Sequence, residues 1–370
     1  MSWVEIELQL VAVVVAVACA LPGVFLVLRR MALMSDAITH TVLLGIVLGF
    51  LYTGMIDSPV LVLGAALTGV LTVALVEALV RTRLVRQDAS IGLVFPALFS
   101  IAVILINRYA GNVHLDTDAV LLGEIAFAPF RRLVVGGVDL GPRTLYVMGG
   151  ILLINAAFIT LFYKEMKLST FDAPLAAALG FAPVVLHYAF MTLVSITAVG
   201  AFDAVGSILV VALMITPPAA AYLIADTLQR VLLLSVVLAA ASAIAGFWLA
   251  WLIDASIAGS MASVAGIVFV LALLFAPARG LVPVAVRRRR QQLSFAGVML
   301  AIHLFQHEGT PEADDESREA HLRHHLRWPA DFARRVVRSA ENRRLIQRGP
   351  ADRLLLTDDG RSVARQALGH

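Results

Sequence analysis

The sequence contains one cysteine, Cys19, in 370 residues. A single thiol excludes an intramolecular disulfide and a cysteine-rich zinc or iron–sulfur site. Charged residues are also scarce: they make up 15% of the chain, against about 25% in soluble globular proteins. No G-x-x-x-x-G-K-[ST] motif is present, so the chain carries no P-loop for ATP hydrolysis. Together these absences argue against a soluble enzyme.

Apolar residues dominate instead and account for 60% of the chain. A helix needs about 20 mostly apolar residues to cross a bilayer, and the sequence predicts nine such spans. They lie at 8–28, 33–54, 58–80, 90–107, 143–163, 183–201, 205–225, 229–252 and 257–277. The N-terminus has no basic segment before the first run, so we expect that run to be retained as a span. The predicted fold class is an all-α polytopic membrane protein.

Charge divides the chain into two parts. Residues 287–370 hold sixteen arginines, eleven acidic residues and no lysine, and the segment opens with four consecutive arginines. We therefore predict a transmembrane domain at 1–286 and a soluble domain at 287–370. Basic residues favour the cytoplasmic side of a membrane protein, and most of them follow spans one, three, five and nine. This distribution predicts a cytoplasmic C-terminus, although Arg108, Arg131, Arg132 and Arg143 would flank an outer loop.

Ionisable residues inside a membrane span are costly and are functional candidates by default. Asp36 and His40 stand four residues apart in the second span, so a helix places them on one face. A carboxylate and an imidazole at that spacing suit one shared divalent cation. An intrahelical Asp–His contact near the helix start is the simpler alternative, and the spacing alone leaves both open.

Other ionisable residues make weaker candidates. His187 could be satisfied by a neighbouring carbonyl, and Asp118 and Glu124 belong to a polar outer loop that would attract cations or merely be solvated. Glu77 stands one turn from Arg81, and we expect the two to pair.

The loop at 164–182, KEMKLSTFDAPLAAALGFA, is unusually apolar for a connector. Ser169 or Thr170 could cap a short alanine-rich helix that ends at Gly180. Such a helix favours docking to a partner protein over a purely solvated connection.

Four strings of the membrane part resemble the permease subunits of ATP-binding-cassette importers for manganese, zinc or iron. They are VFLVLRRMALMSDAITHTVLLGIVLGFL (24–51), RQDASIGLVFPALFSIAVILI (86–106), FYKEMKLSTFDAPLAAALGF (162–181) and AVGSILVVALMITPPAAAYLIA (204–225). They occur in the expected order over about 200 residues. The resemblance implies a multi-pass protein of the cell inner or plasma membrane.

The same resemblance implies the partners and the site. Two permeases, identical or paralogous, would form the channel, two cytoplasmic ATPase subunits would drive it, and an extracytoplasmic binding protein would deliver the metal. Asp36 and His40 match the family's intramembrane metal pair. The loop matches the segment that contacts the ATPase, with Ser169, Phe171, Asp172, Pro174, Leu175 and Gly180 as its candidate residues. The ion is then a substrate, and no permanently bound cofactor is expected.

The tail departs from that family. Three predicted helices followed by a two-strand wing resemble the winged helix-turn-helix domain of iron- or manganese-dependent repressors. Arg334, Arg335 and Arg338 could contact nucleic-acid phosphates, whereas a regulatory or assembly role without DNA is the interpretation we favour.

His303, His307 and the adjacent Glu308 could bind a cytoplasmic metal ion or could be plain surface residues. A membrane-tethered, metal-responsive transcription regulator is thus the alternative function, and export or a chelated substrate stays open within transport.

Overall fold

The computed structural model describes residues 3–55, 58–109, 125–135, 138–319, 321–322 and 326–369. The chain divides into two compact units, Met1–Pro277 and Ala278–His370. This division falls before the boundary expected after residue 286, because the basic run 287–290 lies inside a helix that begins at Leu281.

Nine helices in the described part of the chain are long and apolar enough to cross a membrane. They are α1 (Trp3–Leu28), α2 (Ala32–Thr53), α3 (Pro59–Arg81), α4 (Gln87–Tyr109), α6 (Arg143–Leu161), α9 (Pro183–Val205), α10 (Ser207–Ile224), α11 (Leu228–Ile253) and α12 (Ile257–Phe275). In hydrocarbon a helix satisfies its own backbone hydrogen bonds, which is why unbroken apolar runs take this form. The prediction of nine spans is confirmed.

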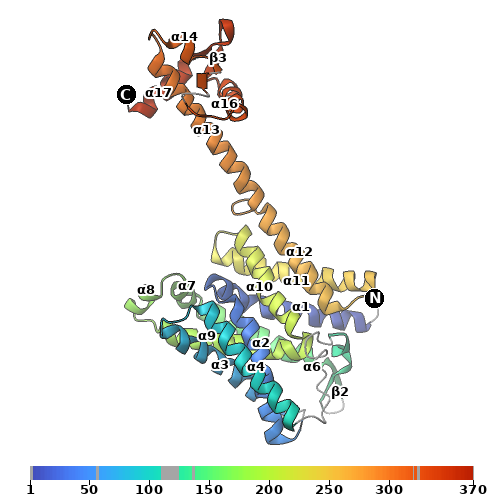
Figure 1. Ribbon diagram of the computed structural model, residues 1–370. Helices are drawn as coiled ribbons and strands as arrows, with labels where there is room; N and C mark the ends of the chain where they lie inside the picture. The colour runs from blue at the N-terminus through green and yellow to red at the C-terminus, as the bar shows by residue number, and fades with distance from the viewer. Residues whose placement is uncertain are drawn as a thin grey trace. The chain divides into compact units, whose positions relative to one another are not determined.

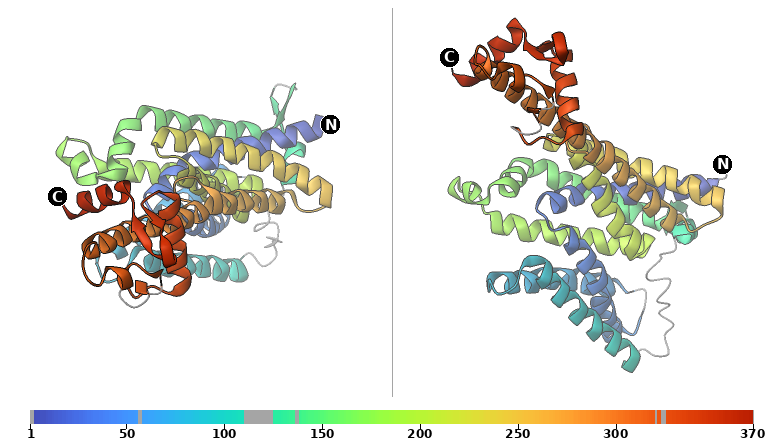
Figure 2. Two further views of the ribbon diagram at one scale, coloured as in Figure 1. Left: turned by 90° about the horizontal axis from the view of Figure 1, so that it is seen from above. Right: turned by 45° about the horizontal axis from the view of Figure 1, so that its top comes forward.

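Short elements connect the long helices at the two ends of the first unit. At one end a 3₁₀ helix, η1 (Ile125–Phe130), precedes a hairpin of β1 (Arg132–Val135) and β2 (Val138–Pro142). At the other end α7 (Tyr163–Phe171) and α8 (Ala173–Ala178) connect α6 to α9. Figures 1 and 2 show the hairpin near the N-terminus and α7 and α8 at the opposite end of the helices.

Close glycine contacts hold α2 against α3. A Cβ atom on Gly45 would lie 2.2 Å from the Gly64 carbonyl oxygen, so only glycine permits this approach. Thr72 donates a 2.7 Å hydrogen bond to the Thr41 hydroxyl across the same contact. Small residues and interhelical hydrogen bonds are the usual basis of helix packing in a membrane. This packing fixes the face that α2 presents, and α2 carries the candidate metal pair.

Ion pairs neutralise two of the basic residues that oppose the predicted orientation. Arg132 lies 2.8 Å from Glu7 and 2.6 Å from Asp139, measured between nitrogen and carboxylate oxygen. Arg131 lies 3.3 Å from Asp203.

The second unit is a small helical domain with one two-stranded sheet. It contains α13 (Leu281–His307), α14 (Ala313–Glu316), α16 (Ala330–Asn342), β3 (Ile346–Arg348), η2 (Pro350–Asp352), β4 (Leu354–Leu356) and α17 (Asp358–Leu368). Strands β3 and β4 pair antiparallel, and the Thr357 hydroxyl caps α17 by accepting from the Gly360 amide at 3.1 Å.

This unit has a hydrophobic core of its own. Leu300 and Leu304 of α13 pack with Val336 and Val337 of α16 and with residues of β3 and β4. On α16 the apolar side faces this core, and the outward side carries the exposed arginines Arg334, Arg335 and Arg338. Helix α16 therefore has an apolar face and a basic face.

Candidate functional site

Asp36 and His40 lie on the first turns of α2, on one face. Asp36 Oδ1 and His40 Nε2 are 3.4 Å apart, which is longer than an ordinary hydrogen bond of 2.7–3.2 Å. Two ligands about 2.1 Å from a tetrahedral ion stand about 3.4 Å apart, so the separation also suits a shared cation. The geometry therefore accommodates the metal interpretation without moving either side chain far.

Both side chains are accessible from outside the protomer. Asp36 is 40% exposed and His40 is 28% exposed, although both belong to a helix that can span a membrane. A carboxylate facing lipid is costly, so such residues face a water-filled path or a protein partner. The exposure thus favours a face of α2 that lines a water-filled path or contacts a protein partner.

The neighbouring hydroxyls do not extend the ligand set. Ser35 donates a 2.8 Å hydrogen bond to the Ala32 carbonyl, and Thr39 donates one of 2.8 Å to the Asp36 carbonyl. Both residues are buried. Both hydroxyl protons are thus used within the helix, and the candidate pair remains the Asp36 carboxylate and the His40 imidazole.

Two aromatic rings of α4 pack against the His40 imidazole. The ring centroids of Phe95 and Phe99 lie 5.6 and 6.0 Å from that of His40. The contact limits the orientations of the imidazole and so helps to hold its nitrogen beside Asp36. Sequence reasoning missed this support, because the two rings come from a different helix.

A second polar group, which we call the Arg29 network, joins α1, α3, α7 and α9. Its members are Arg29, Glu77, Ser169, Thr170, His187 and Tyr188. Arg29 donates hydrogen bonds of 3.1 Å to both the Thr170 and the Ser169 hydroxyl. Burial lowers the pKa of Arg29 to about 10, which leaves the guanidinium charged at neutral pH.

Arg29 also fixes the protonation pattern of His187. A guanidinium can only donate, so His187 Nδ1, 3.2 Å from Arg29 Nη1, accepts. The proton of the neutral ring is then on Nε2, which contacts the Glu77 carboxylate. Glu77 further accepts a 2.5 Å hydrogen bond from the Tyr188 hydroxyl. This arrangement engages both nitrogens of His187 and makes it a network residue rather than an evident metal ligand.

The predicted Glu77–Arg81 pair is present but weak, since the charged atoms lie 3.7 Å apart. His187 and Tyr188 are the nearer partners of Glu77. The other two weaker metal candidates, Asp118 and Glu124, lie outside the described residues.

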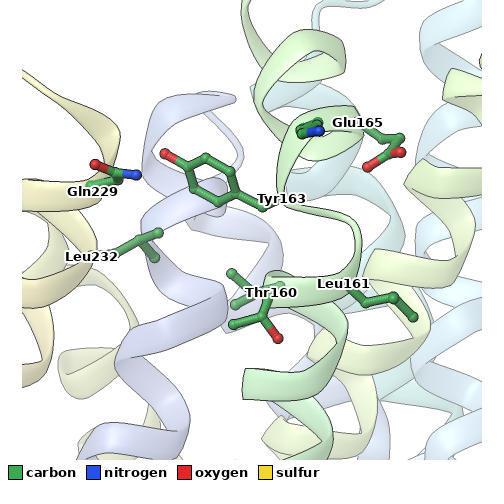
Figure 3. A pocket seen from close by; sticks show the side chains of 8 residues that line it. Thr160, Leu161, Tyr163, Glu165, Gln229 and Leu232 are labelled. Atoms are coloured by element: carbon green, nitrogen blue, oxygen red, sulfur yellow. The ribbon is translucent and has the colours of Figure 1, made fainter.

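Two cavities open at the α7–α8 end of the first unit. One of about 450 Å³ borders the Arg29 network and is lined partly by Arg29, Glu77, Ser169 and His187. The other, of about 610 Å³, lies where α6 meets α7. Figure 3 shows Thr160, Tyr163 and Glu165 on one side of it and Gln229 and Leu232 of α11 on the other. The lining of the second cavity includes no histidine, so it offers no carboxylate–imidazole pair.

Helix α8 has a defined start and end. The Asp172 carboxylate accepts a 2.9 Å hydrogen bond from the Leu175 amide and so caps the helix, with Pro174 in its first turn. The predicted caps, Ser169 and Thr170, are wrong, because α7 runs through them to Phe171 and their hydroxyls meet Arg29. Gly180 follows the helix with φ +87°, a conformation that favours glycine.

Large apolar side chains are exposed along this segment. Phe171 is 63% exposed, Leu175 45% and Leu179 61%, whereas Ala176 is buried. An accessible apolar surface on a short, capped helix is typical of a protein-docking site. Of the four alanines of α8 only Ala176 is buried, so the helix presents its surface mainly through larger residues.

Comparisons with known proteins extend over most of the chain. The profile of the ABC 3 transport family matches residues 6–276. The zinc transport system membrane protein TroD of Treponema pallidum is 51% identical over 362 residues, which cover 98% of each protein. The manganese transport system membrane protein MntD of Bacillus subtilis is 46% identical over 285 residues, covering 77% of this chain and 96% of that one.

A solved structure shares the arrangement of the helices. PsaBC from Streptococcus pneumoniae, in complex with Fab, aligns with a TM-score of 0.63 at 27% sequence identity. The alignment covers 75% of this chain and 94% of the PsaBC chain. The match to TroD, which covers nearly the whole chain, includes most of the second unit as well.

Proposed function

This chain belongs to the ABC 3 transport family, as the membrane permease of a metal importer, and from that premise we propose that Asp36 and His40 bind the ion on its way through. The observation that carries the proposal is the exposed carboxylate–imidazole pair on a membrane-spanning helix. A charged carboxylate that faced lipid would be costly, so the proposal places the pair on the translocation path.

A second permease, identical or paralogous, would complete the site. One protomer supplies one carboxylate oxygen and one imidazole nitrogen, and a symmetric partner would supply the same again. Four such ligands suit Mn²⁺, Zn²⁺ or Fe²⁺, whereas the lack of a thiolate disfavours Cu⁺. A transport site must bind weakly enough to release the ion, so two ligands from each protomer need not form a tight cage. The ion is a substrate, and the permease needs no resident cofactor.

ATP would be hydrolysed on two separate cytoplasmic subunits that dock against α8. The exposed Leu175 of α8 and Phe171, the last residue of α7, provide the apolar contact, and the Asp172 cap fixes the start of α8 between them. The Arg29 network then ties α7 to the spanning helices α1 and α9. A movement of the docked ATPase would therefore be passed to the helices of the path. An extracytoplasmic binding protein would deliver the metal at the hairpin end.

This assignment predicts a definite orientation, with the hairpin outside and the C-terminus in the cytoplasm. The single native cysteine is buried, so introduced cysteines can be labelled selectively. Val134→Cys in the exposed part of the hairpin should react with a membrane-impermeant maleimide in intact cells. Ser362→Cys on the exposed side of α17 should react only after the cells are opened. The reverse pattern would overturn the orientation.

The tail is proposed to be a winged-helix module with a regulatory or assembly role. Helices α13, α14, α16 and α17, the β3–β4 pair and the basic face of α16 support that fold. The alternative of a tethered transcription regulator is not favoured, because TroD, which matches over 98% of the chain, is itself named as a transport protein.

Transport is tested by uptake of radioactive Mn²⁺ and Zn²⁺ in cells that contain the ATPase, the binding protein and this chain. We expect uptake that depends on the chain and on ATP, with one ion preferred. A cell lacking only this chain serves as the control. Equal uptake of both ions with and without the chain would contradict the function.

A further inference from the structure

The second unit contains a cluster of metal-ligating side chains that the transport path does not use. His303 and His307 lie one turn apart at the end of α13, and Glu316 belongs to α14. One ligand atom from each of the three lies within 4.8 Å of the other two. His303 is 8% exposed and Glu316 is 6% exposed, so the cluster is inside the domain rather than on its surface.

The carboxylate of this cluster differs from the one that the sequence suggested. The predicted third ligand, Glu308, lies 2.7 Å from Arg361 Nη2 and is bound by that guanidinium. The hydrogen bonds from Arg361 lower the pKa of Glu308. Asp314 is similarly paired with Arg353. Glu316 is the carboxylate that faces the histidines instead, with its Oε2 atom 3.2 Å from His303 Nε2.

The hydrogen bonding of His307 prepares one of its nitrogens for a metal ion. Its Nδ1 atom lies 2.9 Å from the His303 carbonyl oxygen. A carbonyl only accepts, so Nδ1 carries the proton and the lone pair of the neutral ring is on Nε2. Metal-bound histidines commonly donate their other ring N–H to a carbonyl in this way, which fixes the tautomer and the ring orientation.

The distances fit a shared ion. Ligands about 2.1 Å from a tetrahedral ion are about 3.4 Å apart, close to the 3.2 Å between His303 and Glu316. All three ligand atoms lie within 4.8 Å of one another, a separation that rotation of the His307 side chain can shorten. A cavity of about 130 Å³ lies beside His307, between Leu304 and Ser317. It has room for a water molecule as a fourth ligand.

We propose that His303, His307 and Glu316 form a Zn²⁺ site in the second unit. Two imidazoles, one carboxylate and a water make a common zinc ligand set. Nitrogen-rich sites bind Zn²⁺ more tightly than Mn²⁺ or Fe²⁺. Zn²⁺ needs the lone pair of His303 Nε2, so binding releases any proton that this atom carries. The ion links α14 to the end of α13, so zinc orders this part of the unit whichever metal the path carries.

The test uses the full-length chain, purified in detergent and stripped of metal, without the binding protein. Asp36→Ala and His40→Ala are both introduced, so that the membrane pair does not contribute. We expect this parent to bind one Zn²⁺ per chain in equilibrium dialysis. We also expect Co²⁺ at the same site to show the visible absorption of a low-symmetry, four-coordinate ion. A parent with neither signal would overturn the proposal before any further variant is made.

Two additional variants locate the site within that parent. Glu316→Gln and His307→Gln should each weaken Zn²⁺ binding by about 100-fold or more, because even the loss of an indirect partner of a ligand costs about 10–100-fold. Glu308→Gln is the matched control and should bind as the parent does. Unchanged binding in Glu316→Gln, or an equal loss in Glu308→Gln, would contradict the ligand set. Size-exclusion profiles confirm that each variant is folded.

Discussion

Asp36→Ala and His40→Ala are each expected to reduce metal uptake by about 100-fold or more, to the background of cells without the permease. Each change removes one of the two ligands that a protomer contributes. Even the loss of an indirect partner of a metal ligand lowers metal affinity or activity by about 10–100-fold. The measurement is the initial rate of radioactive Mn²⁺ and Zn²⁺ uptake in cells with the complete system. Membrane levels of each variant are measured in parallel.

The controls for this prediction come from α2 and from the neighbouring helix α4. Ser35→Ala removes a hydroxyl next to Asp36 that bonds only to the Ala32 carbonyl, and uptake should stay within about twofold of wild type. Asp88→Ala removes an exposed carboxylate at the start of α4 and should also retain uptake. Uptake at the wild-type rate in either Asp36→Ala or His40→Ala would refute the assignment of the pair.

Leu175→Asp is expected to abolish uptake by a different route, the loss of ATPase docking. A charge at this exposed apolar position would have to be desolvated against the partner, which costs several kcal/mol when it is unpaired. Copurification of the ATPase should be lost. Ala177→Ser, on the exposed part of the same short helix, should leave both docking and uptake intact. Stable copurification of the ATPase with Leu175→Asp would refute docking at α8.

Arg29→Lys distinguishes docking of the ATPase from transmission of its movement to the membrane-spanning helices. Lysine keeps the positive charge but cannot reproduce the planar fork that reaches Ser169, Thr170 and His187 at once. The ATPase should still copurify and hydrolyse ATP, while fewer ions are carried for each ATP consumed. An unchanged ratio of ions to ATP would show that the Arg29 network does not pass on the movement.

The spans were predictable because a bilayer imposes a simple rule. Each predicted run is long and apolar, and each became a helix. The Asp36–His40 pair was also predictable, since both residues lie on one helix at a spacing that places them on one face. Local patterns of this kind carry their geometry in the sequence. The same holds for Thr357, whose cap on α17 depends on neighbours three residues away.

Contacts between distant residues were not predictable. Arg29 meets Thr170 and His187 across 141 and 158 residues, and no local pattern encodes that approach. His303 and His307 were identified by their spacing, but Glu308 was chosen as their partner because it is adjacent. Arg361, 53 residues away, binds Glu308, and Glu316 reaches the histidines from the next helix. The cap of α8 was missed because Ser169, Thr170 and Asp172 are all good caps, and only tertiary contacts distinguish them.

The most direct test of the account is ATP-driven metal accumulation in proteoliposomes. The permease, its ATPase and the binding protein are purified and reconstituted, and ion uptake and ATP hydrolysis are measured together. Wild type should accumulate Mn²⁺ or Zn²⁺ in proportion to ATP consumed. The variant with both Asp36→Ala and His40→Ala should assemble with the ATPase and accumulate none. Accumulation by this variant at the wild-type rate would contradict a path through the Asp36–His40 pair.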